Sequence, residues 1–173
     1  MAPRSFYFAR PWMAAVCAAF FFCACAMPDS IKPGMTESDV LSTYGKPDSH
    51  FTLPDGGKRI EYNRGEWMQR SWMVDFDRDG RVVGVDQVRD EEHFARLRPG
   101  MDTKESVRRE LGTPWKVEYY PPSKLTAWLY PYREAGIYYS VMAVMFDPSG
   151  VYRRSENGPD PRFMGGDGKT GRE

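Results

Sequence analysis

The residue best placed for chemistry in this sequence is Cys25, which ends an apolar N-terminal run. The first ten residues carry Arg4 and Arg10 and no acidic side chain, and residues 11–22 are nearly all apolar. A positively charged start, an apolar stretch of about 7–15 residues and a small-residue exit are typical of a secretory signal peptide. The run is too short to span a bilayer as a helix, which needs about 20 residues. We therefore expect residues 1–24 to be an export leader.

Two processing routes are open at the end of this leader. Residues 22–25 (FCAC) resemble a bacterial lipobox, in which the last cysteine is lipidated, whereas residues 24–26 (ACA) fit a signal-peptidase site that would release a protein starting at Met27. All three cysteines lie in or at the end of the leader, so an exported fold built from the rest uses no disulfide. We favour lipidation of Cys25, with residues 25–30 as a linker from the anchor to the fold.

A second candidate for chemistry is an acidic segment that nearly satisfies a calcium-binding loop. Asp75, Asp77, Asp79 and Asp86 are spaced like ligands of an EF-hand, with Gly80 at its glycine position. An EF-hand needs flanking helices, whereas the flanks here are rich in β-branched and aromatic residues and predict strands. We therefore interpret the segment as a hairpin turn and expect no metal site.

Catalytic and cofactor motifs are scarce. His50 and His93 are the two histidines, and neither has a cysteine or histidine at metal-ligand spacing. No phosphate-binding loop, dinucleotide fingerprint or nucleophile-elbow motif occurs. Lys plus Arg and Asp plus Glu each number 24, a poor footprint for nucleic-acid binding, which depends on concentrated positive charge. We expect a non-enzymatic protein without cofactors and without a nucleic-acid partner.

The elements that would carry these residues come in two similar halves. Residues 31–35 (IKPGM) recur as residues 97–101 (LRPGM), and further matches follow in the same order. These matches pair Val40, Gly45, Pro47, Phe76 and Gly80 with Val107, Gly112, Pro114, Phe146 and Gly150. Agreement in order, spacing and residue type indicates an internal duplication. We expect one repeat over residues 31–89 and a second over residues 90–155.

Each repeat predicts a short helix followed by strands. Thr36 is a good N-cap and Gly45 a helix end in the first repeat, and Asp102 or Thr103 and then Gly112 take these roles in the second. A further short helix is expected ahead of the second repeat's main helix. The expected helix and strand ranges are 90–97 for that helix, 58–63, 71–76 and 81–89 for the first set of strands, and 116–120, 125–130, 137–146 and 151–154 for the second.

These elements define the fold class. We expect an α+β protein made of two tandem helix-plus-antiparallel-meander units, each with a three-stranded sheet and with helices packed on one face of each sheet. From residue 156 the chain is rich in Gly, Pro, Asp and Lys without periodicity. We expect residues 156–173 to be a disordered tail.

Aromatic residues crowd the second repeat. Residues 137–146 are apolar on both alternating faces, whereas a strand with helices on one side only should carry polar residues on the other. Either the first repeat or a protein partner must cover that second face. On the second alternative, Trp128, Tyr130 and Tyr139 are the candidate partner-binding residues.

The first repeat resembles the SmpA/OmlA (BamE) family, and the second repeat does so more loosely over residues 97–154. The resemblance is carried by residues 34–36 (GMT) with Val40, Gly45, Pro47, Ile60, Tyr62, Phe76, Gly80 and Val82. It implies a protein-binding module of envelope or β-barrel assembly, with the barrel assembly machinery as partner. It also implies a lipid anchor on the periplasmic face of the outer membrane. Ala26 after Cys25, rather than Asp, implies sorting to that membrane.

Two features limit which residues and which function can be inferred from the resemblance. Family members have a Gln-Gly-Asn stretch before their first helix, implicated in contacts to lipid and to the barrel partner. This chain has residues 27–32 (MPDSIK) there, so no contact residues are transferred. Two tandem copies are also similar to β-lactamase-inhibitor protein, which leaves a periplasmic or secreted protein inhibitor as the alternative function.

The leader generates the first testable prediction. Replacing Cys25 by Ala should shift the protein from the membrane to the soluble envelope fraction and abolish labelling by radioactive palmitate, because the lipid would have no attachment point. Fractionation and labelling of wild type and variant check this. A wild-type protein that never takes up label and fractionates as soluble would contradict lipidation.

Overall fold

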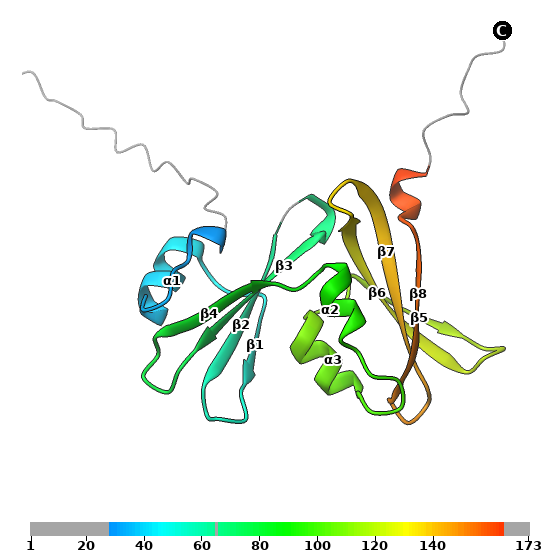
Figure 1. The fold of residues 1–173 in the computed structure, drawn as a ribbon, viewed down its shortest axis with the longest axis horizontal. Helices are drawn as coiled ribbons and strands as arrows, with labels where there is room; N and C mark the ends of the chain where they lie inside the picture. The colour runs from blue at the N-terminus through cyan, green and yellow to red at the C-terminus, as the bar shows by residue number, and fades with distance from the viewer. Residues whose placement is uncertain (1–27, 65, 165–173) are drawn as a thin grey trace, which may run out of the picture.

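Two antiparallel sheets lie side by side with helices between them in the computed structural model, which describes residues 28–64 and 66–164 (Figure 1). None of the helices in these described ranges is long and apolar enough to cross a membrane. The helical elements are η1 Pro28–Ser30, α1 Glu37–Tyr44, η2 Glu66–Met68, α2 Glu91–Ala95, α3 Lys104–Leu111 and η3 Pro161–Phe163. The strands are β1 Ser49–Thr52, β2 Lys58–Arg64, β3 Arg70–Phe76, β4 Val82–Gln87, β5 Lys116–Tyr120, β6 Leu125–Glu134, β7 Tyr138–Phe146 and β8 Tyr152–Pro159.

The two main helices begin and end as their sequences predict. The side chain of Thr36 accepts a hydrogen bond from the backbone N–H three residues on, and the side chain of that residue bonds back to the Thr36 N–H. Thr103 and the residue three positions on make the same reciprocal pair of hydrogen bonds. Thr103 rather than Asp102 is therefore the N-cap of α3. Both helices end at a glycine with positive φ, 77° at Gly45 and 78° at Gly112.

Each sheet has four strands, in the orders β1-β2-β3-β4 and β5-β6-β7-β8, where three-stranded sheets were expected. The four strand ranges expected in the second repeat all form strands, whereas the first repeat has one strand, β1, for which no range was expected. The added strand β1 is four residues long and pairs Ser49 with Glu61, and so short a segment carries little periodic signal. β8 extends to Pro159, which pairs with Ser140 of the long strand β7. The expected tail from residue 156 is therefore ordered up to Met164, and residues 165–173 lie outside the described residues.

The acidic segment forms the predicted hairpin turn between β3 and β4. One carboxylate oxygen of Asp77 accepts hydrogen bonds from the backbone N–H groups of Asp79 and Arg81, both at 2.9 Å. Asp147 makes the equivalent bonds to Ser149 and Val151 in the second repeat. The carboxylate at the start of each turn thus stabilises the turn by accepting backbone hydrogen bonds.

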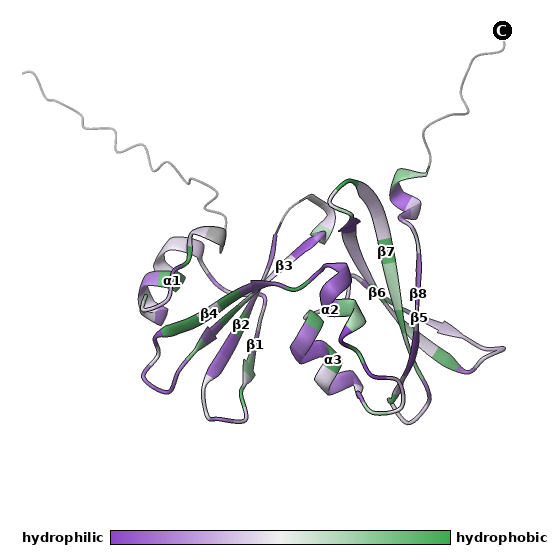
Figure 2. Cartoon of the chain, in the orientation of Figure 1, coloured by the Kyte–Doolittle hydropathy of each residue, from purple (hydrophilic) through white to green (hydrophobic). Residues whose placement is uncertain are grey.

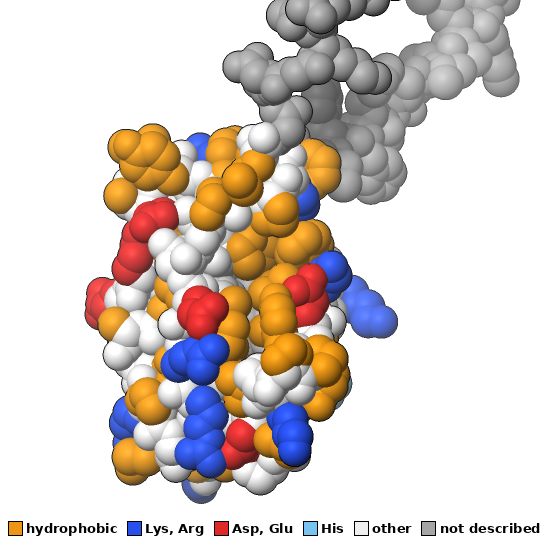
Figure 3. All heavy atoms as spheres, turned by 90° about the vertical axis from the view of Figure 1, so that its right-hand side faces the viewer, with side chains coloured by type: hydrophobic (Ala, Val, Ile, Leu, Met, Phe, Trp, Pro, Cys, Tyr) orange, Lys and Arg blue, Asp and Glu red, His pale blue; other side chains and the backbone are white. Residues whose placement is uncertain are grey.

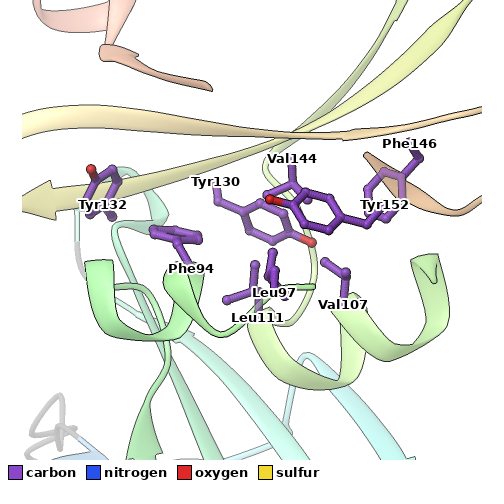
Figure 4. Close-up of a cluster of buried hydrophobic side chains, with 9 residues drawn as sticks. All are labelled: Phe94, Leu97, Val107, Leu111, Tyr130, Tyr132, Val144, Phe146 and Tyr152. Atoms are coloured by element: carbon purple, nitrogen blue, oxygen red, sulfur yellow. The ribbon is translucent and has the colours of Figure 1, made fainter. Parts of the chain in front are cut away.

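Two hydrophobic cores match the two repeats. α1 packs on one face of the first sheet over a cluster that includes Ile60 and Val74, and α2 and α3 pack on one face of the second sheet. Figure 4 shows this second cluster, with the ring of Tyr130 on β6 directed toward the helices. In both repeats a buried tyrosine hydroxyl donates to the carbonyl of the helix-ending glycine, Tyr62 to Gly45 at 2.8 Å and Tyr130 to Gly112 at 3.2 Å.

The layers alternate along the molecule as helix, sheet, helices, sheet (Figure 1). The first sheet is covered on one face by α1, and its other face meets the second repeat near the end of α3. Contact is direct, since the guanidinium of Arg59 on β2 donates to the backbone carbonyl of Arg109 on α3 at 2.9 Å. The helices of the second repeat therefore contact both sheets.

A buried carboxylate joins the repeats. Glu61 on β2 has 0% of its surface exposed, and its two oxygens accept hydrogen bonds from the backbone N–H and the hydroxyl of Thr113, both at 2.8 Å. Ser71 on β3 donates a further bond at 3.1 Å. Thr113 directly follows the glycine that ends α3, so the carboxylate of the first repeat fixes the helix end of the second.

Arg89, in the segment between the repeats, adds a buried positive charge at the same joint. Its guanidinium donates to the carbonyl of Thr113 at 2.6 Å, to the side chain of Asn63 at 2.9 Å and to the carbonyl of Met68. Burial lowers the pKa of Arg89 to about 10, against the opposing effect of Glu61, so the side chain is still charged at neutral pH. A buried charge needs such partners, because its desolvation is costly.

The outward face of the second sheet is not covered by the first repeat. It carries a small apolar cluster of Leu125, Ala127 and Met145, with Leu129 and Ala143 beside it. Figure 3 views the molecule from this side, with hydrophobic side chains over the centre and upper end of the face and most Lys and Arg side chains below. The hydropathy colouring shows the corresponding apolar stretch on β7 (Figure 2). Leu125, Ala127 and Met145 nevertheless expose at most 8% of their surface, so this part of the face is buried within the chain without a partner.

The joint predicts unequal effects at the two helix-ending glycines. A Cβ at Gly45 would meet nothing within 4 Å, whereas a Cβ at Gly112 would lie 2.2 Å from Oε1 of Glu61 and 2.9 Å from the end of Met73. Gly45→Ala should cost only the positive-φ strain of about 1–2 kcal/mol. Gly112→Ala should cost that plus about 1–3 kcal/mol of overpacking.

Thermal unfolding of the two variants checks this, with Gly45→Ala as the matched control. Since about 1 kcal/mol shifts Tm by about 2–8 °C, the difference between the variants is measurable. Equal Tm values for Gly45→Ala and Gly112→Ala would contradict a close contact between the repeats at Glu61.

Candidate functional site

Exposed apolar side chains gather at one end of the molecule, where the β6–β7 turn, the β2–β3 connection and η3 meet (Figure 1). Ile137, Tyr138 and Met164 each expose about two-thirds of their surface. The group is Trp67, Ile137, Tyr138, Tyr139, Phe163 and Met164, and we call it the aromatic end. Contiguous exposed apolar surface of this kind marks interaction sites on proteins.

The β6–β7 turn projects the first part of the aromatic end. Ala135 and Gly136 both have positive φ, 49° and 72°, as in the two-residue turns that suit tight hairpins. The N–H of Ile137 closes the turn by donating to the carbonyl of Glu134 at 3.0 Å. The N–H of Ala135 donates to the carboxylate of Glu91 on α2 at 2.6 Å. The turn is therefore held against the helix layer while its apolar residues face outward.

Ring contacts hold the less exposed residues of the aromatic end together. The rings of Tyr139 and Phe163 stack with centroids 3.8 Å apart and an interplanar angle of 18°, and the guanidinium of Arg133 lies 3.9 Å from the Tyr139 ring centre. Trp67 contacts Phe163 edge-on at 6.0 Å. Aromatic and cation–π contacts of this geometry stabilise and orient the rings.

η3 fastens this end to both repeats. Asp160 is fully buried and pairs with Arg162, whose Nε lies 2.9 Å from Oδ1 of Asp160. The Arg162 guanidinium lies 4.1 Å over the ring of Trp115 in the second repeat and donates to the carbonyl of Trp67 in the first at 3.2 Å. The ordered C-terminal segment thus builds a surface shared by the two repeats.

A pocket of about 530 Å³ opens beside Tyr138, Tyr139 and Phe163. One wall is the carboxylate of Glu134, which accepts hydrogen bonds from the hydroxyl of Ser140 at 2.6 Å and the amide of Asn157 at 2.9 Å. These bonds hold the pKa of Glu134 below its usual value. The described residues contain no cluster that could hold a metal ion.

The three residues expected to bind a partner lie in different environments. Tyr130 has 0% of its surface exposed, and Trp128 is partly buried against the same core, with its ring 4.9 Å from that of Phe146. Tyr139 is 38% exposed and belongs to the aromatic end. A binding role stays a prediction for all three, and Tyr139 is the one that a partner can reach without unpacking the core. Cys25 lies outside the described residues.

Sequence reasoning missed Trp67, Phe163 and Arg162. Trp67 and the residue after it adopt positive φ without being glycine, a conformation that sequence does not signal. Phe163 and Arg162 lie in the segment that composition assigned to the tail. The available signal was the pair of large side chains Phe163 and Met164 in an otherwise polar stretch.

Surface and core aromatics predict opposite responses to substitution. Ile137→Asp and Tyr138→Asp should leave Tm within error, because both side chains are mostly solvated. Tyr130→Ala should lose about 3–5 kcal/mol, because it empties the core below β6. Thermal unfolding of the three variants checks this, and a large loss of stability in the Tyr138 variant would show that the turn is not free surface.

Comparison with known proteins finds a family match on the second repeat. The family model described as outer membrane protein assembly factor BamE domain matches residues 87–156, which run from the last residue of β4 into β8. No curated protein matches the chain. A solved structure, the DUF4309 family protein YjgB from Bacillus subtilis subsp. subtilis str. 168, is 15% identical over 72% of this chain and 78% of its own, with a TM-score of 0.31, too low for inference. Residues 87–156 of this chain are thus similar to the BamE domain family.

Proposed function

We propose that this chain is a non-enzymatic outer-membrane lipoprotein that acts as a protein-binding module in envelope assembly, with the barrel assembly machinery as its partner. The observation that carries the proposal is the match of residues 87–156 to a domain described as an outer membrane protein assembly factor. The N-terminal pattern that ends at Cys25 supports a lipid anchor on the periplasmic face.

The aromatic end is the binding surface in this proposal. Its outermost residues, Ile137, Tyr138 and Met164, are solvated, while stacked rings and Arg162 hold the layer beneath them in place. Rigid aromatic surface costs little conformational entropy on binding, and Tyr, Trp, Met and Arg are enriched where proteins meet. Partner side chains would enter the pocket beside Tyr139.

The alternative function, a periplasmic or secreted protein inhibitor, gains no support from these observations. The family match is to a domain described as an outer membrane protein assembly factor, which does not favour an inhibitor. Trp128 and Tyr130 contribute to binding, in this proposal, only by supporting β6 and β7 from within the core.

Site-directed crosslinking in the envelope tests the proposal. A photoreactive residue at Tyr138 should crosslink to components of the barrel assembly machinery, identified with specific antibodies, because this side chain leads the proposed contact. The same residue at Val83, 58% exposed on β4, is the matched control and should give no such product.

A second measurement uses copurification. Tyr138→Asp combined with Tyr139→Ala should reduce recovery of those components about tenfold or more, the effect of losing about 1.4 kcal/mol of binding. Val83→Asp should leave recovery unchanged. Copurification that is the same in all three proteins would refute the aromatic end as the binding surface.

A further inference from the structure

β5 combines a free backbone edge with exposed apolar side chains. In the order β5-β6-β7-β8 it has a strand on one side only. Val117 and Tyr119 expose 55% and 61% of their surface, and Tyr120 exposes 40%. An edge strand presents a row of unpaired N–H and C=O groups that another strand can complete.

The edge strands at the other end of each sheet, β4 and β8, are partly paired. The first residue of β4, Val82, exchanges backbone hydrogen bonds with Gly34 and Met35, at 2.8 and 2.9 Å. The first residue of β8, Tyr152, does the same with Gly100 and Asp102. β8 also carries the charges and proline that commonly protect an edge, in Arg153, Arg154, Glu156 and Pro159.

β1, the counterpart of β5 in the first repeat, is flanked by the second repeat. The hydroxyls of Ser49 on β1 and Thr113 after α3 lie 3.2 Å apart. A hollow beside this contact is lined by Phe51 and Thr52 from β1 and by Glu105, Arg108 and Arg109 from α3. No further repeat follows β5 in the described part of the chain, so the equivalent position is open.

We propose that β5 is a strand-addition site, which takes an extended segment of a partner protein as a fifth strand of the second sheet. The segment would pair through its backbone with β5 and place alternate apolar side chains beside Val117 and Tyr119. On the opposite face it would meet Lys116 and Glu118, which form an ion pair at 2.6 Å. The occupant is therefore an extended segment that alternates apolar with polar residues.

The face that carries Val117 extends the packed part of the sheet. Val117 pairs across the ladder with Trp128, whose ring packs on Phe146 in the core. Apolar side chains added beside Val117 would continue this surface. A second copy of the chain fits less well, because an antiparallel β5 pair that sets Val117 opposite Tyr119 also sets Glu118 opposite Glu118, and like charges directly opposite are destabilising.

Peptide binding by the purified full-length protein tests the site. The probe is a fluorescent peptide of about ten residues that alternates valine with threonine or lysine, measured by anisotropy. Val117→Lys with Tyr119→Lys should weaken binding at least about tenfold without changing Tm, because both side chains are solvated. Val83→Lys with Met101→Lys, which alters apolar residues 58% and 65% exposed elsewhere, is the matched control and should bind like wild type.

The backbone contribution is tested with the same peptide methylated at alternate amide nitrogens. Methylation removes one row of donors, so binding should be lost. Equal binding of methylated peptide, unchanged binding by the lysine variant of β5, or dimerisation through β5 in sedimentation would each overturn the proposal. The site is separate from the aromatic end, so peptide binding that persists in the Tyr138→Asp, Tyr139→Ala protein would keep it independent of the proposed function.

Discussion

The buried carboxylate of Glu61 is the interaction on which the rest of the structure depends. Each repeat could place its own helices on its own sheet, but Glu61 binds Thr113 through both oxygens and so ties the first sheet to the end of α3. Once buried, the carboxylate requires these donors, because an unpaired charge in a low dielectric is strongly unfavourable. Arg89 adds a second buried charge that bonds to the same residue. The joint therefore links the two repeats through buried, hydrogen-bonded side chains.

The joint also explains why the two repeats differ where they are otherwise alike. The carbonyls of Glu61 and Leu129 accept equivalent backbone hydrogen bonds, from Asp48 and Trp115, so the two side chains occupy the same place in their sheets. The Glu61 carboxylate faces the end of α3, whereas Leu129 packs beside the small apolar cluster on the outward face of the second sheet. The two proposed binding surfaces, the aromatic end and β5, are built mainly from the second repeat. The match to the BamE domain falls on this half.

Sequence reasoning predicted the local structure well because local signals determined it. The threonine caps, the helix-ending glycines and the Asp77 turn all depend on contacts within a few residues, and all were found. It missed β1, β8 beyond residue 154 and η3, whose order comes from pairing with distant strands. The aromatic end was the hardest part to predict from the sequence. Tyr139 was named, but Trp67 and Arg162 come together with it through contacts between residues far apart in the sequence, such as that of Arg162 with the Trp67 carbonyl. Glu61 carries no sequence signal for burial, since its partner lies in the other repeat.

We interpret Glu61 and Thr113 as one unit that joins the repeats, and a double-mutant cycle can test this interpretation. Unfolding free energies would be measured for Glu61→Leu, which installs the residue found at the equivalent position of the second repeat, for Thr113→Val and for the double variant. Residues in one hydrogen-bond network show coupling of about 0.5–3 kcal/mol. The account predicts that the double variant loses at least about 1 kcal/mol less than the sum of the single losses. Additive losses would mean that the two side chains stabilise their own repeats separately, and would contradict the joint.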